Sequence, residues 1–259
     1  MKIFKNRSIY DEVIDKYDEL HVEIYNVVEQ RRLKELLLKI TKKFNSVDRK
    51  LALDFGTGSG NLLKFFKSMG FNSIGMDVSY NCLSFVKKKY NADGFIMYNG
   101  KNINVLKNNM FDIVGIYSVL HHIDDYISTL IELYNKLKKG GILYIDHEAN
   151  ENYWIDDHMY KRYLTDMIKL KGKAGIFERL RYSILKIYNK KYQSEGDIHV
   201  FKDDHIEWDL IESKLIRVGA KVLLKGEYLL CRGDEFVEIY EKYKDKLTDM
   251  NFLVLQKPK

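Results

Sequence analysis

Three closely spaced glycines follow an aspartate in the stretch from residue 51 to residue 63, which reads LALDFGTGSGNLL. The apolar run ends on Asp54, and an apolar-periodic segment begins after the last glycine. The glycines stand at alternate positions, Gly56, Gly58 and Gly60. This order predicts a buried strand, a tight loop and the start of a helix. Because glycine lets a ligand approach the backbone and a helix start presents unpaired N–H groups, the stretch indicates a nucleotide-like ligand at the carboxyl edge of a sheet.

The spacing of the glycines narrows the class of ligand. The pattern is G-x-G-x-G with an acid two residues before the first glycine, whereas the dinucleotide fingerprint is G-x-G-x-x-G. No GK[ST] sequence follows it, which argues against a phosphate-binding P-loop. The carboxylate of Asp54 argues against a bound pyrophosphate and for a cationic or amine-bearing ligand. A glycine-rich turn that binds nothing is the alternative.

The stretch resembles motif I of the class I S-adenosylmethionine-dependent methyltransferases, whose usual form is [hydrophobic]-D-x-G-x-G-x-G. The resemblance implies a Rossmann-like α/β fold, with a seven-stranded, mostly parallel sheet and helices on both faces. The segment NFLVLQKPK resembles the antiparallel seventh strand of that fold. The family's cofactor is S-adenosylmethionine. The residues that the motif implies as cofactor ligands are Asp54, Gly56, Thr57, Gly58 and Gly60.

Polar residues also end the next two predicted strands. Asp77 ends the apolar run FNSIGMD and is placed to accept two hydrogen bonds from ribose hydroxyls. Val78, the next residue, is a further expected cofactor contact. An ordinary strand-end aspartate is the alternative. In the family, a stretch D-A-x-x-L follows strand three, and its aspartate contacts the adenine amino group. Asn99 and Gly100 occupy that frame here, so the resemblance implies adenine recognition through a neutral acceptor.

Two adjacent histidines leave the fourth predicted strand, in FDIVGIYSVLHHIDD. A neutral imidazole can accept a hydroxyl proton, so His121 and His122 are candidates for a general base. The passage resembles motif IV of small-molecule methyltransferases, and we expect Ser118 at the strand tip to contact the cofactor. We expect the two rings to face opposite ways, with His122 toward the cleft and His121 as the second candidate. A packed, hydrogen-bonded histidine is the alternative for each.

A third histidine lies at the tip of the fifth predicted strand, ILYIDHEAN, between Asp146 and Glu148. Strand tips at this edge point toward the ligand, so His147 is a further catalytic candidate, with ordinary loop capping as the alternative. The chain carries neither a [DN]-P-P-[YF] signature nor a Pro-Cys pair. Their absence argues against amino methylation of bases and against cytosine C5 chemistry.

Residues 1–45 read as a helical segment ahead of the first strand, because apolar residues recur there near helical spacing. Many small-molecule methyltransferases fold a similar tyrosine-containing segment over the cofactor. The resemblance implies that Tyr10 and Tyr17 form a partial lid, and that Arg31 or Arg32 contacts the methionine carboxylate. Two ordinary half-buried tyrosines are the alternative.

A basic segment separates the predicted cofactor-binding core, residues 46–150, from the completion of that core at residues 196–259. Residues 161–191 hold ten lysines and arginines and only two acids, a net charge of +8. Apolar residues recur there at helical spacing, which predicts two amphipathic helices in a cap at residues 151–195, over the cleft. The basic face favours an anionic substrate, an anionic membrane surface or nucleic acid as partner, and a solvated face is the alternative.

The whole chain has 259 residues, 46% of them hydrophobic, and a net charge of +6, which suits one large domain with a substantial core. No apolar run approaches the roughly eighteen residues of a membrane span, and the first residues lack the apolar region of a secretory signal. Two widely separated cysteines suggest a reducing compartment and no metal cluster. We therefore expect a cytoplasmic protein without a metal site.

Together these patterns predict an enzyme that moves a methyl group from S-adenosylmethionine to an oxygen, nitrogen or carbon atom of a small metabolite. The basic segment favours an anionic metabolite. An RNA methyltransferase that uses the basic cap is the second hypothesis. A protein that binds S-adenosylmethionine without transferring its methyl group is the third.

Overall fold

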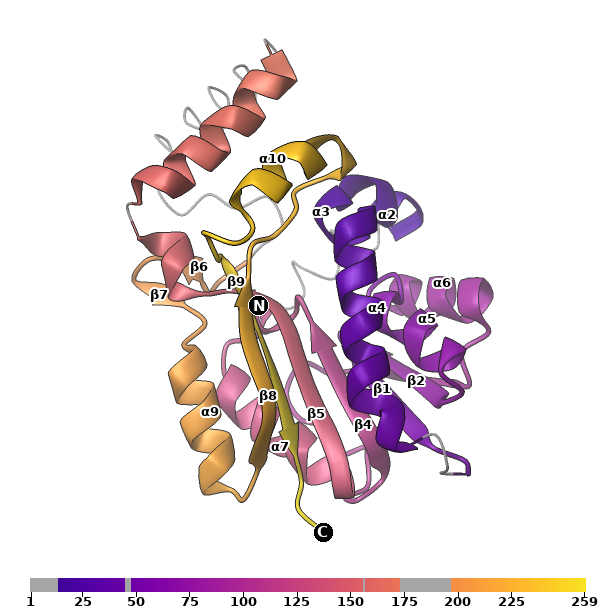
Figure 1. Cartoon of the computed structure of the whole chain (residues 1–259). Coiled ribbons are helices and arrows are strands. Elements are labelled where there is room, and N and C mark those ends of the chain that lie inside the picture. Colours follow the sequence, from indigo (N-terminus) through magenta and orange to yellow (C-terminus); the bar gives the residue numbers. More distant parts are fainter. Residues whose placement is uncertain (1–13, 45–47, 156, 173–196) are drawn as a thin grey trace.

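The computed structural model describes residues 14–44, 48–155, 157–172 and 197–259, and its centre is a seven-stranded sheet (Figure 1). From one edge to the other the strands are β3 (Gly94–Met97), β2 (Asn72–Asp77), β1 (Leu51–Phe55), β4 (Phe111–Tyr117), β5 (Leu137–Ala149), β9 (Met250–Gln256) and β8 (Lys221–Tyr228). The strands β1 to β5 run parallel, whereas β9 is antiparallel to both of its neighbours, β5 and β8. The predicted seven-stranded, mostly parallel sheet with an antiparallel last strand is confirmed.

The sequence of each strand matches its place in the sheet. The strand β4 reads FDIVGIY and all of its residues are buried, as expected for a central parallel strand that is covered on both faces. The edge strand β8 reads KVLLKGEY and alternates exposed with half-buried residues. The core therefore centres on β4 and thins toward β8.

Helices cover both faces of the sheet, as the fold prediction requires (Figure 1). On one face, α4 (Val27–Thr41) and α5 (Asn61–Ser68) contribute Leu33, Leu37, Leu62 and Phe66 to a buried cluster. On the other face, α7 (Tyr126–Lys136) and α9 (Trp208–Arg217) contribute Leu130, Leu133, Ile211 and Leu215. The helix α6 (Tyr80–Tyr90) adjoins β2 and β3. Within the described residues, no helix combines the length and apolar character that crossing a membrane requires.

The predicted N-terminal helical segment is a series of short helices followed by a long one. The short ones are η1 (Ile14–Lys16), α2 (Tyr17–Leu20) and α3 (Val22–Tyr25), and η2 (Lys42–Phe44) follows α4. Asn26 caps α4, because its side-chain oxygen accepts a hydrogen bond from the N–H of Glu29. Its side-chain nitrogen donates a second hydrogen bond to the carbonyl oxygen of Cys231. Asn26 therefore holds this segment against the C-terminal part of the chain. Residues 1–13, with Tyr10, lie outside the described residues.

The strand order creates a crevice at the carboxyl ends of β1 and β4, which are adjacent in the sheet. From β1 the chain proceeds to β2 and β3 on one side, and it then resumes with β4 on the other side of β1. At such a reversal the loops after neighbouring strands diverge and leave room for a ligand. The loops that carry the glycines, Asp77 and the histidine pair therefore meet at one edge.

The described part of the predicted cap packs differently from the prediction. After η4 (Glu151–Trp154), residues 158–172 form a helix that packs on the segment containing η5 (Asp234–Phe236) and α10 (Val237–Tyr243). The packed side chains are Tyr160, Tyr163, Met167, Leu229, Phe236 and Tyr243. The hydroxyl of Tyr160 donates to Asp249, and that of Tyr163 donates to the carbonyl of Leu230. This part of the cap is therefore fixed to the C-terminal segment. Residues 173–195 of the predicted cap lie outside the described residues, and the chain resumes with the small hairpin β6 (Val200–Phe201) and β7 (Asp204–His205).

We expect Gly115→Ala to destabilise the fold, because β4 and α5 leave no room for a methyl group. A Cβ atom at Gly115 would lie 2.7 Å from Cδ1 of Leu62 and 2.9 Å from Cζ of Phe66. Overpacking of this kind typically costs about 1–3 kcal/mol of unfolding free energy, which urea unfolding measures. The control is Gly94→Ala, where the added atom would be 3.4 Å from Cγ1 of Ile74. Equal losses in the two variants would contradict this account of the core.

Candidate active site

The carboxylate of Asp54 holds the glycine-rich loop from inside. Its Oδ2 accepts a hydrogen bond from Oγ1 of Thr57 at 2.8 Å and another from the N–H of Leu63 at 3.0 Å. The side chain is buried, and burial raises the pKa of Asp54 to about 7. This acid therefore shapes the loop and the first turn of α5. The expectation that it faces a cationic ligand is not met.

The loop after β1 is joined to the end of β2. The N–H of Gly56 donates to the carbonyl oxygen of Met76 at 2.8 Å, and the N–H of Gly58 donates to Oδ2 of Asp77 at 2.9 Å. The other oxygen of Asp77 accepts from the N–H of Ser79. Gly58 has a φ of +48°, and a Cβ there would meet no atom within 4 Å. The loop is thus held on one side and open on the other.

A cavity of about 270 Å³ lies where the loops after β1, β2 and β4 meet. The predicted site residues that line it are Tyr17, Gly56, Thr57, Gly58, Asp77, Val78, Gly100, Ser118 and His122. Five predicted residues are outside its lining: Asp54, Gly60, Asn99, His121 and His147. Lining residues that the sequence analysis did not single out include Tyr25, Ser59, Asn61, Tyr98, Lys101, Tyr117, Asp124 and Asp125. The structure therefore brings most of the predicted ligand-binding positions to one cavity and adds an aromatic wall.

Asn99 has a different role from the one that the resemblance implies. Its side chain is exposed, and its Oδ1 accepts from the N–H groups of Lys101 at 2.9 Å and Asn102 at 3.1 Å. The acceptor oxygen is therefore used to hold its own loop. The preceding residue, Tyr98, lines the cavity, and its ring packs edge-on against Phe55 with centroids 5.2 Å apart. An aromatic residue directly after an apolar strand was the available signal for this position.

Tyrosines of the N-terminal segment form one wall of the cavity. Tyr17 and Tyr25 both line it, with ring centroids 6.5 Å apart in an edge-on arrangement. The hydroxyl of Tyr25 is hydrogen-bonded to Ser59 of the glycine-rich loop, and Ser59 donates to Asp18 at 2.8 Å. Asp18 in turn pairs with Lys89 of α6. The segment is therefore fastened to the loop after β1 and to α6.

Arg32 does not contact the cavity. Its guanidinium donates to Glu29 and to Asp146, the latter at 2.8 Å, and lies 3.7 Å from the ring centroid of Tyr228. Both carboxylates are buried, and their charges raise the pKa of Arg32 further above its usual value against the opposing effect of burial. The arginine therefore neutralises buried acids, and the expected contact with a methionine carboxylate is not met for Arg32.

The two histidines after β4 lie side by side in η3 (Leu120–His122). Their ring centroids are 4.1 Å apart with an interplanar angle of 51°, so the prediction that they face opposite ways is wrong. Nδ1 of His121 is 2.7 Å from Oε2 of Glu148, whose other oxygen accepts the N–H groups of Val119 and Leu120. His122 alone of the pair lines the cavity. Burial, with a smaller effect of the neighbouring His121, lowers the pKa of His122 well below its usual value.

His147 sits on a bulge between β5 and β9, where its φ is +64°. Its ring packs on Tyr117 with centroids 4.7 Å apart, and the tyrosine separates it from the cavity that Tyr117 lines. Burial lowers the pKa of His147 to about 4. The structure therefore places this catalytic candidate behind the wall of the cavity, where it packs.

Comparison with known proteins gives a consistent assignment. Residues 53–145 match the protein family described as "Methyltransferase domain". The matched range includes the loops after β1, β2 and β4. The chain is a class I S-adenosylmethionine-dependent methyltransferase. The predicted enzyme class is confirmed, and so is S-adenosylmethionine as the methyl donor.

The methyltransferase has distant relatives among characterised proteins. It is 26% identical over 184 residues to a demethylmenaquinone methyltransferase of Staphylococcus saprophyticus, which covers 69% of this chain and 77% of the relative. It is 25% identical to a ubiquinone biosynthesis O-methyltransferase of Rickettsia canadensis, over 47% of this chain and 52% of that one. An N-methyltransferase from Bradyrhizobium japonicum, solved with S-adenosylhomocysteine, has the same fold with a TM-score of 0.58. That likeness covers 98% of this chain and all of the other at 12% identity.

We propose that Asp77 accepts hydrogen bonds from the ribose hydroxyls of the methyl donor. Asp77→Ala should then weaken the binding of S-adenosylhomocysteine by about 1.5–3 kcal/mol, the range for hydrogen bonds to a charged group. The matched control is Asp93→Ala. Asp93 directly precedes the first residue of β3, and its carboxylate accepts a hydrogen bond from the N–H of Ser73. Calorimetry on both variants measures the affinity. An unchanged affinity in folded Asp77→Ala, or equal losses in the two variants, would show that the ribose binds elsewhere.

The raised pKa of Asp54 gives a pH-dependent stability. Because the pKa in the folded protein, about 7, exceeds the roughly 3.9 of an unfolded chain, folding favours the protonated form. The stability of the wild type should fall as the pH rises from about 4 to about 7 and level off above. Asp54→Asn can keep both hydrogen bonds, which go to one oxygen, and carries no charge.

The free energy of unfolding of Asp54→Asn, relative to the wild type, should therefore increase between about pH 5 and about pH 7 and stay constant above. Urea unfolding across that range measures it. The control Asp93→Asn should differ from the wild type by a constant amount over this range. Burial raises the pKa of Asp93, but its hydrogen bonds and the charge of Lys67 together outweigh burial and lower that pKa below its usual value. A constant difference for Asp54→Asn as well would contradict the raised pKa.

Proposed function

We propose that this methyltransferase acts on a small hydroxylated aromatic molecule and methylates one of its oxygens or a ring carbon next to one. The observation that supports this most is that His122 lines the same cavity as the glycine-rich loop and Asp77. One relative is named a demethylmenaquinone methyltransferase, and another a ubiquinone biosynthesis O-methyltransferase. Both names refer to quinones, whose reduced forms are hydroxylated aromatic rings. The aromatic wall of the cavity suits such a ring.

We expect the two reactants to lie against different loops of the cavity. The nucleoside part of the donor would lie against Asp77, Tyr98 and Gly100, and the acceptor would lie between Tyr17 and His122. The sulfonium methyl group is already activated, because S-adenosylhomocysteine leaves as a neutral thioether when the carbon–sulfur bond breaks. The main contribution of the protein is then to align the acceptor with that methyl group, which can lower the barrier by several kcal/mol.

The charge of the cavity favours a neutral acceptor. Its lining holds three carboxylates, from Asp77, Asp124 and Asp125, and one ammonium group, from Lys101. This balance attracts the cationic sulfonium of the donor and disfavours an anionic acceptor. The preference for an anionic metabolite came from the basic segment, and the described part of that segment packs on α10, away from the cavity.

A hydroxyl acceptor must lose its proton as the methyl group arrives. The side chain of His122 is on the acceptor side of the proposed arrangement, and general-base catalysis contributes about 10²–10⁴-fold in such reactions. A free amine as acceptor would need no such group. The dependence of the rate on His122 therefore separates hydroxylated from amine acceptors.

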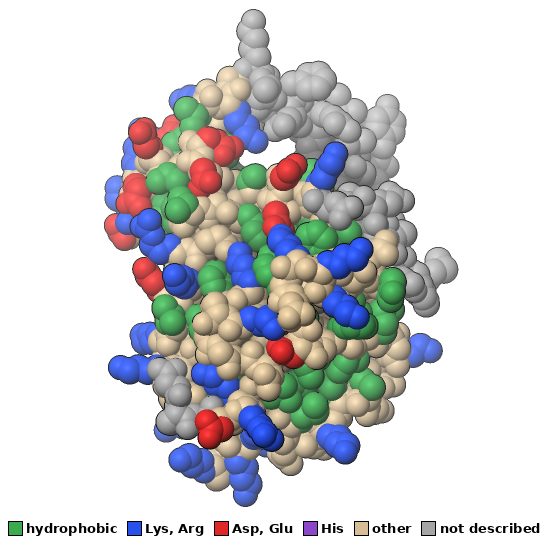
Figure 2. Space-filling view, turned by 90° about the vertical axis from the view of Figure 1, so that its right-hand side faces the viewer, with side chains coloured by type: hydrophobic (Ala, Val, Ile, Leu, Met, Phe, Trp, Pro, Cys, Tyr) green, Lys and Arg blue, Asp and Glu red, His purple; other side chains and the backbone are tan. Residues whose placement is uncertain are grey.

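The RNA methyltransferase hypothesis has less support in the described residues. It depends on the basic segment 161–191, of which only residues 161–172 are described. On the face that Figure 2 shows, lysine and arginine side chains are dispersed and form no continuous stripe. A duplex or single strand is held by a contiguous basic surface. A small-molecule acceptor is therefore the better-supported class.

The purified chain should transfer labelled methyl groups from S-adenosylmethionine to a catechol or to reduced demethylmenaquinone, and much less to a primary amine or to RNA. His122→Ala should lower kcat by at least about 10²-fold while the affinity for S-adenosylhomocysteine stays within a few-fold. The control is His205→Ala, on β7. Label that enters only RNA or amines, or full kcat in His122→Ala, would contradict the proposal. Binding of the donor without transfer to any acceptor would support the non-catalytic hypothesis.

A further inference from the structure

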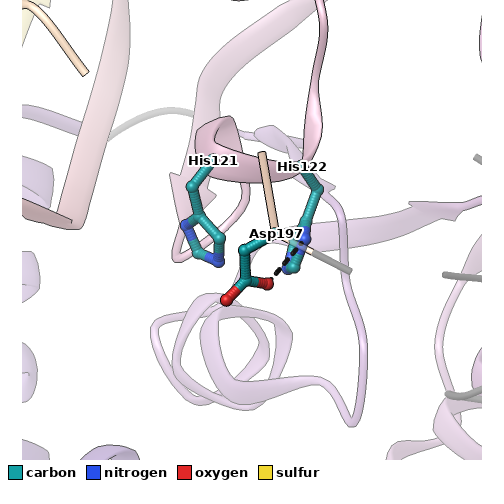
Figure 3. A group of neighbouring side chains, drawn as sticks. All are labelled: His121, His122 and Asp197. Carbon is teal, nitrogen blue, oxygen red and sulfur yellow. Dashed lines mark ion pairs between the residues drawn. The ribbon is translucent and has the colours of Figure 1, made fainter. Parts of the chain in front are cut away.

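Three side chains that can bind metals converge beside the cavity. His121 and His122 come from η3 after β4, and Asp197 comes from the segment that leads into β6. One potential ligand atom of each lies within 4.8 Å of the others. Figure 3 shows the carboxylate of Asp197 between the two imidazole rings, and Nδ1 of His122 is 3.3 Å from Oδ1 of Asp197. Within the described residues, this is the group of histidines and acids with that arrangement.

The spacing of these atoms suits a single ion. Nitrogen and oxygen ligands lie about 2.0–2.2 Å from a first-row divalent metal, so two ligands of one ion are at most about 4.4 Å apart. The 3.3 Å between Nδ1 of His122 and Oδ1 of Asp197 is within that limit, and all the potential ligand atoms of the group lie within 4.8 Å of one another. A rotation of a side chain about χ1 or χ2 brings any pair beyond about 4.4 Å within reach of one ion.

Glu148 holds the ring of His121 in the orientation that is usual for a histidine that binds a metal. The 2.7 Å contact between Nδ1 of His121 and Oε2 of Glu148 places the ring proton on Nδ1, and Nε2 points toward Asp197 (Figure 3). When one nitrogen of a histidine binds a metal, the N–H of the other almost always donates a hydrogen bond to a carboxylate, a carbonyl or water. Glu148 itself is fixed by two backbone N–H groups, from Val119 and Leu120. The imidazole is therefore held in one tautomer and one orientation.

The charges around the pair also favour a cation. The carboxylates of Glu148 and Asp197 lie on either side of His121, and both histidine rings are half-buried. Two carboxylates that face the same imidazole ring repel each other, and a positive charge between them relieves that repulsion. A divalent ion bound to Nε2 of His121, Nδ1 of His122 and Asp197 supplies that charge.

We propose that His121, His122 and Asp197 bind a divalent transition-metal ion at the acceptor side of the cavity. Two imidazoles and one carboxylate suit zinc, iron, cobalt, nickel or manganese, whereas magnesium and calcium prefer oxygen ligands alone. This revises the expectation from the sequence that the chain holds no metal. The proposal that a cation binds depends only on these three residues. The proposal that the cation serves catalysis also depends on the proposed hydroxylated acceptor.

Three protein ligands leave positions on the ion for other groups. Because His122 lines the cavity, such a position would face the acceptor. An acceptor hydroxyl that binds the ion loses its proton more readily, since a divalent metal lowers the pKa of a bound hydroxyl or water. The methyl group would then bond to the oxygen, or to the ring carbon made nucleophilic by it, as its bond to sulfur breaks and S-adenosylhomocysteine leaves. In the second case the proton of that ring carbon would pass to solvent afterwards. In this arrangement His122 would act by holding the ion, and the ion would act as a Lewis acid, so that the hydroxyl proton passes to solvent.

Titration of the metal-free full-length chain with cobalt(II), in the presence of S-adenosylhomocysteine, tests the site directly. We expect one equivalent to bind, with visible d–d absorption bands of cobalt(II) that differ from those of the ion in water. Asp197→Asn and His122→Gln should each weaken cobalt binding by at least about 10-fold, since even outer partners of metal ligands contribute 10–100-fold. His205→Gln, a histidine of β7 outside the group, is the control and should bind cobalt as the wild type does.

No stoichiometric cobalt binding by the wild type, or equal binding by Asp197→Asn, would overturn the metal site. The methyl transfer assay in the presence of EDTA separates this result from the proposed function. If a metal serves the reaction, the rate on a catechol should fall in EDTA and return when manganese, cobalt or zinc is added in excess. Full transfer in EDTA together with absent cobalt binding would reject the metal and leave the methyltransferase function in place. Transfer to no hydroxylated ring, with cobalt bound as expected, would reject the acceptor and keep the site.

Discussion

The turn that shapes the acceptor side of the cavity depends on one buried carboxylate. Glu148, at the end of β5, accepts the N–H groups of Val119 at 2.8 Å and Leu120 at 2.6 Å, and contacts Nδ1 of His121 at 2.7 Å. Hydrogen bonds to a charged acceptor are about twice as strong as those between neutral groups. Because these bonds fix the backbone just before His122, they determine which side chain of the pair reaches the cavity. Asp54 does the same for the glycine-rich loop from the end of β1.

Behind that turn, a second group of buried charges ties the N-terminal helix to the sheet. Arg32 of α4 donates to Glu29 and to Asp146 of β5, and the hydroxyl of Tyr117 donates to Glu29 at 2.8 Å. Removing one partner of a buried ion pair typically costs about 3–5 kcal/mol of unfolding free energy. These contacts therefore hold α4 firmly against this edge of the sheet. Tyr17 lines the cavity and is only ten positions ahead of α4, so the contacts that hold α4 also limit how far Tyr17 can move. The interactions that stabilise the core thus also set the shape of the site.

The sequence predicted the parts of the molecule whose signals are local. The strand, loop and helix around Asp54 and the acid at Asp77 depend on a few neighbouring residues, and both the sheet and the cavity at its edge follow from them. Asn99 occupies the family's adenine position in the sequence, but a neutral amide can hold its own loop, which the sequence does not reveal. The pairing of His122 with Asp197 could not be predicted, because these residues are far apart in the chain and meet only through the folded turn after β4.

Methyl transfer as proposed requires donor and acceptor to share the cavity between the glycine-rich loop and His122. A crystal structure with S-adenosylhomocysteine, soaked with manganese and examined by anomalous scattering, tests that arrangement most directly. We expect the ribose hydroxyls on Asp77, the sulfur atom facing the space between Tyr17 and His122, and one anomalous peak among His121, His122 and Asp197. A sulfur atom that faces away from His122, with the peak absent, would contradict both the acceptor position and the metal.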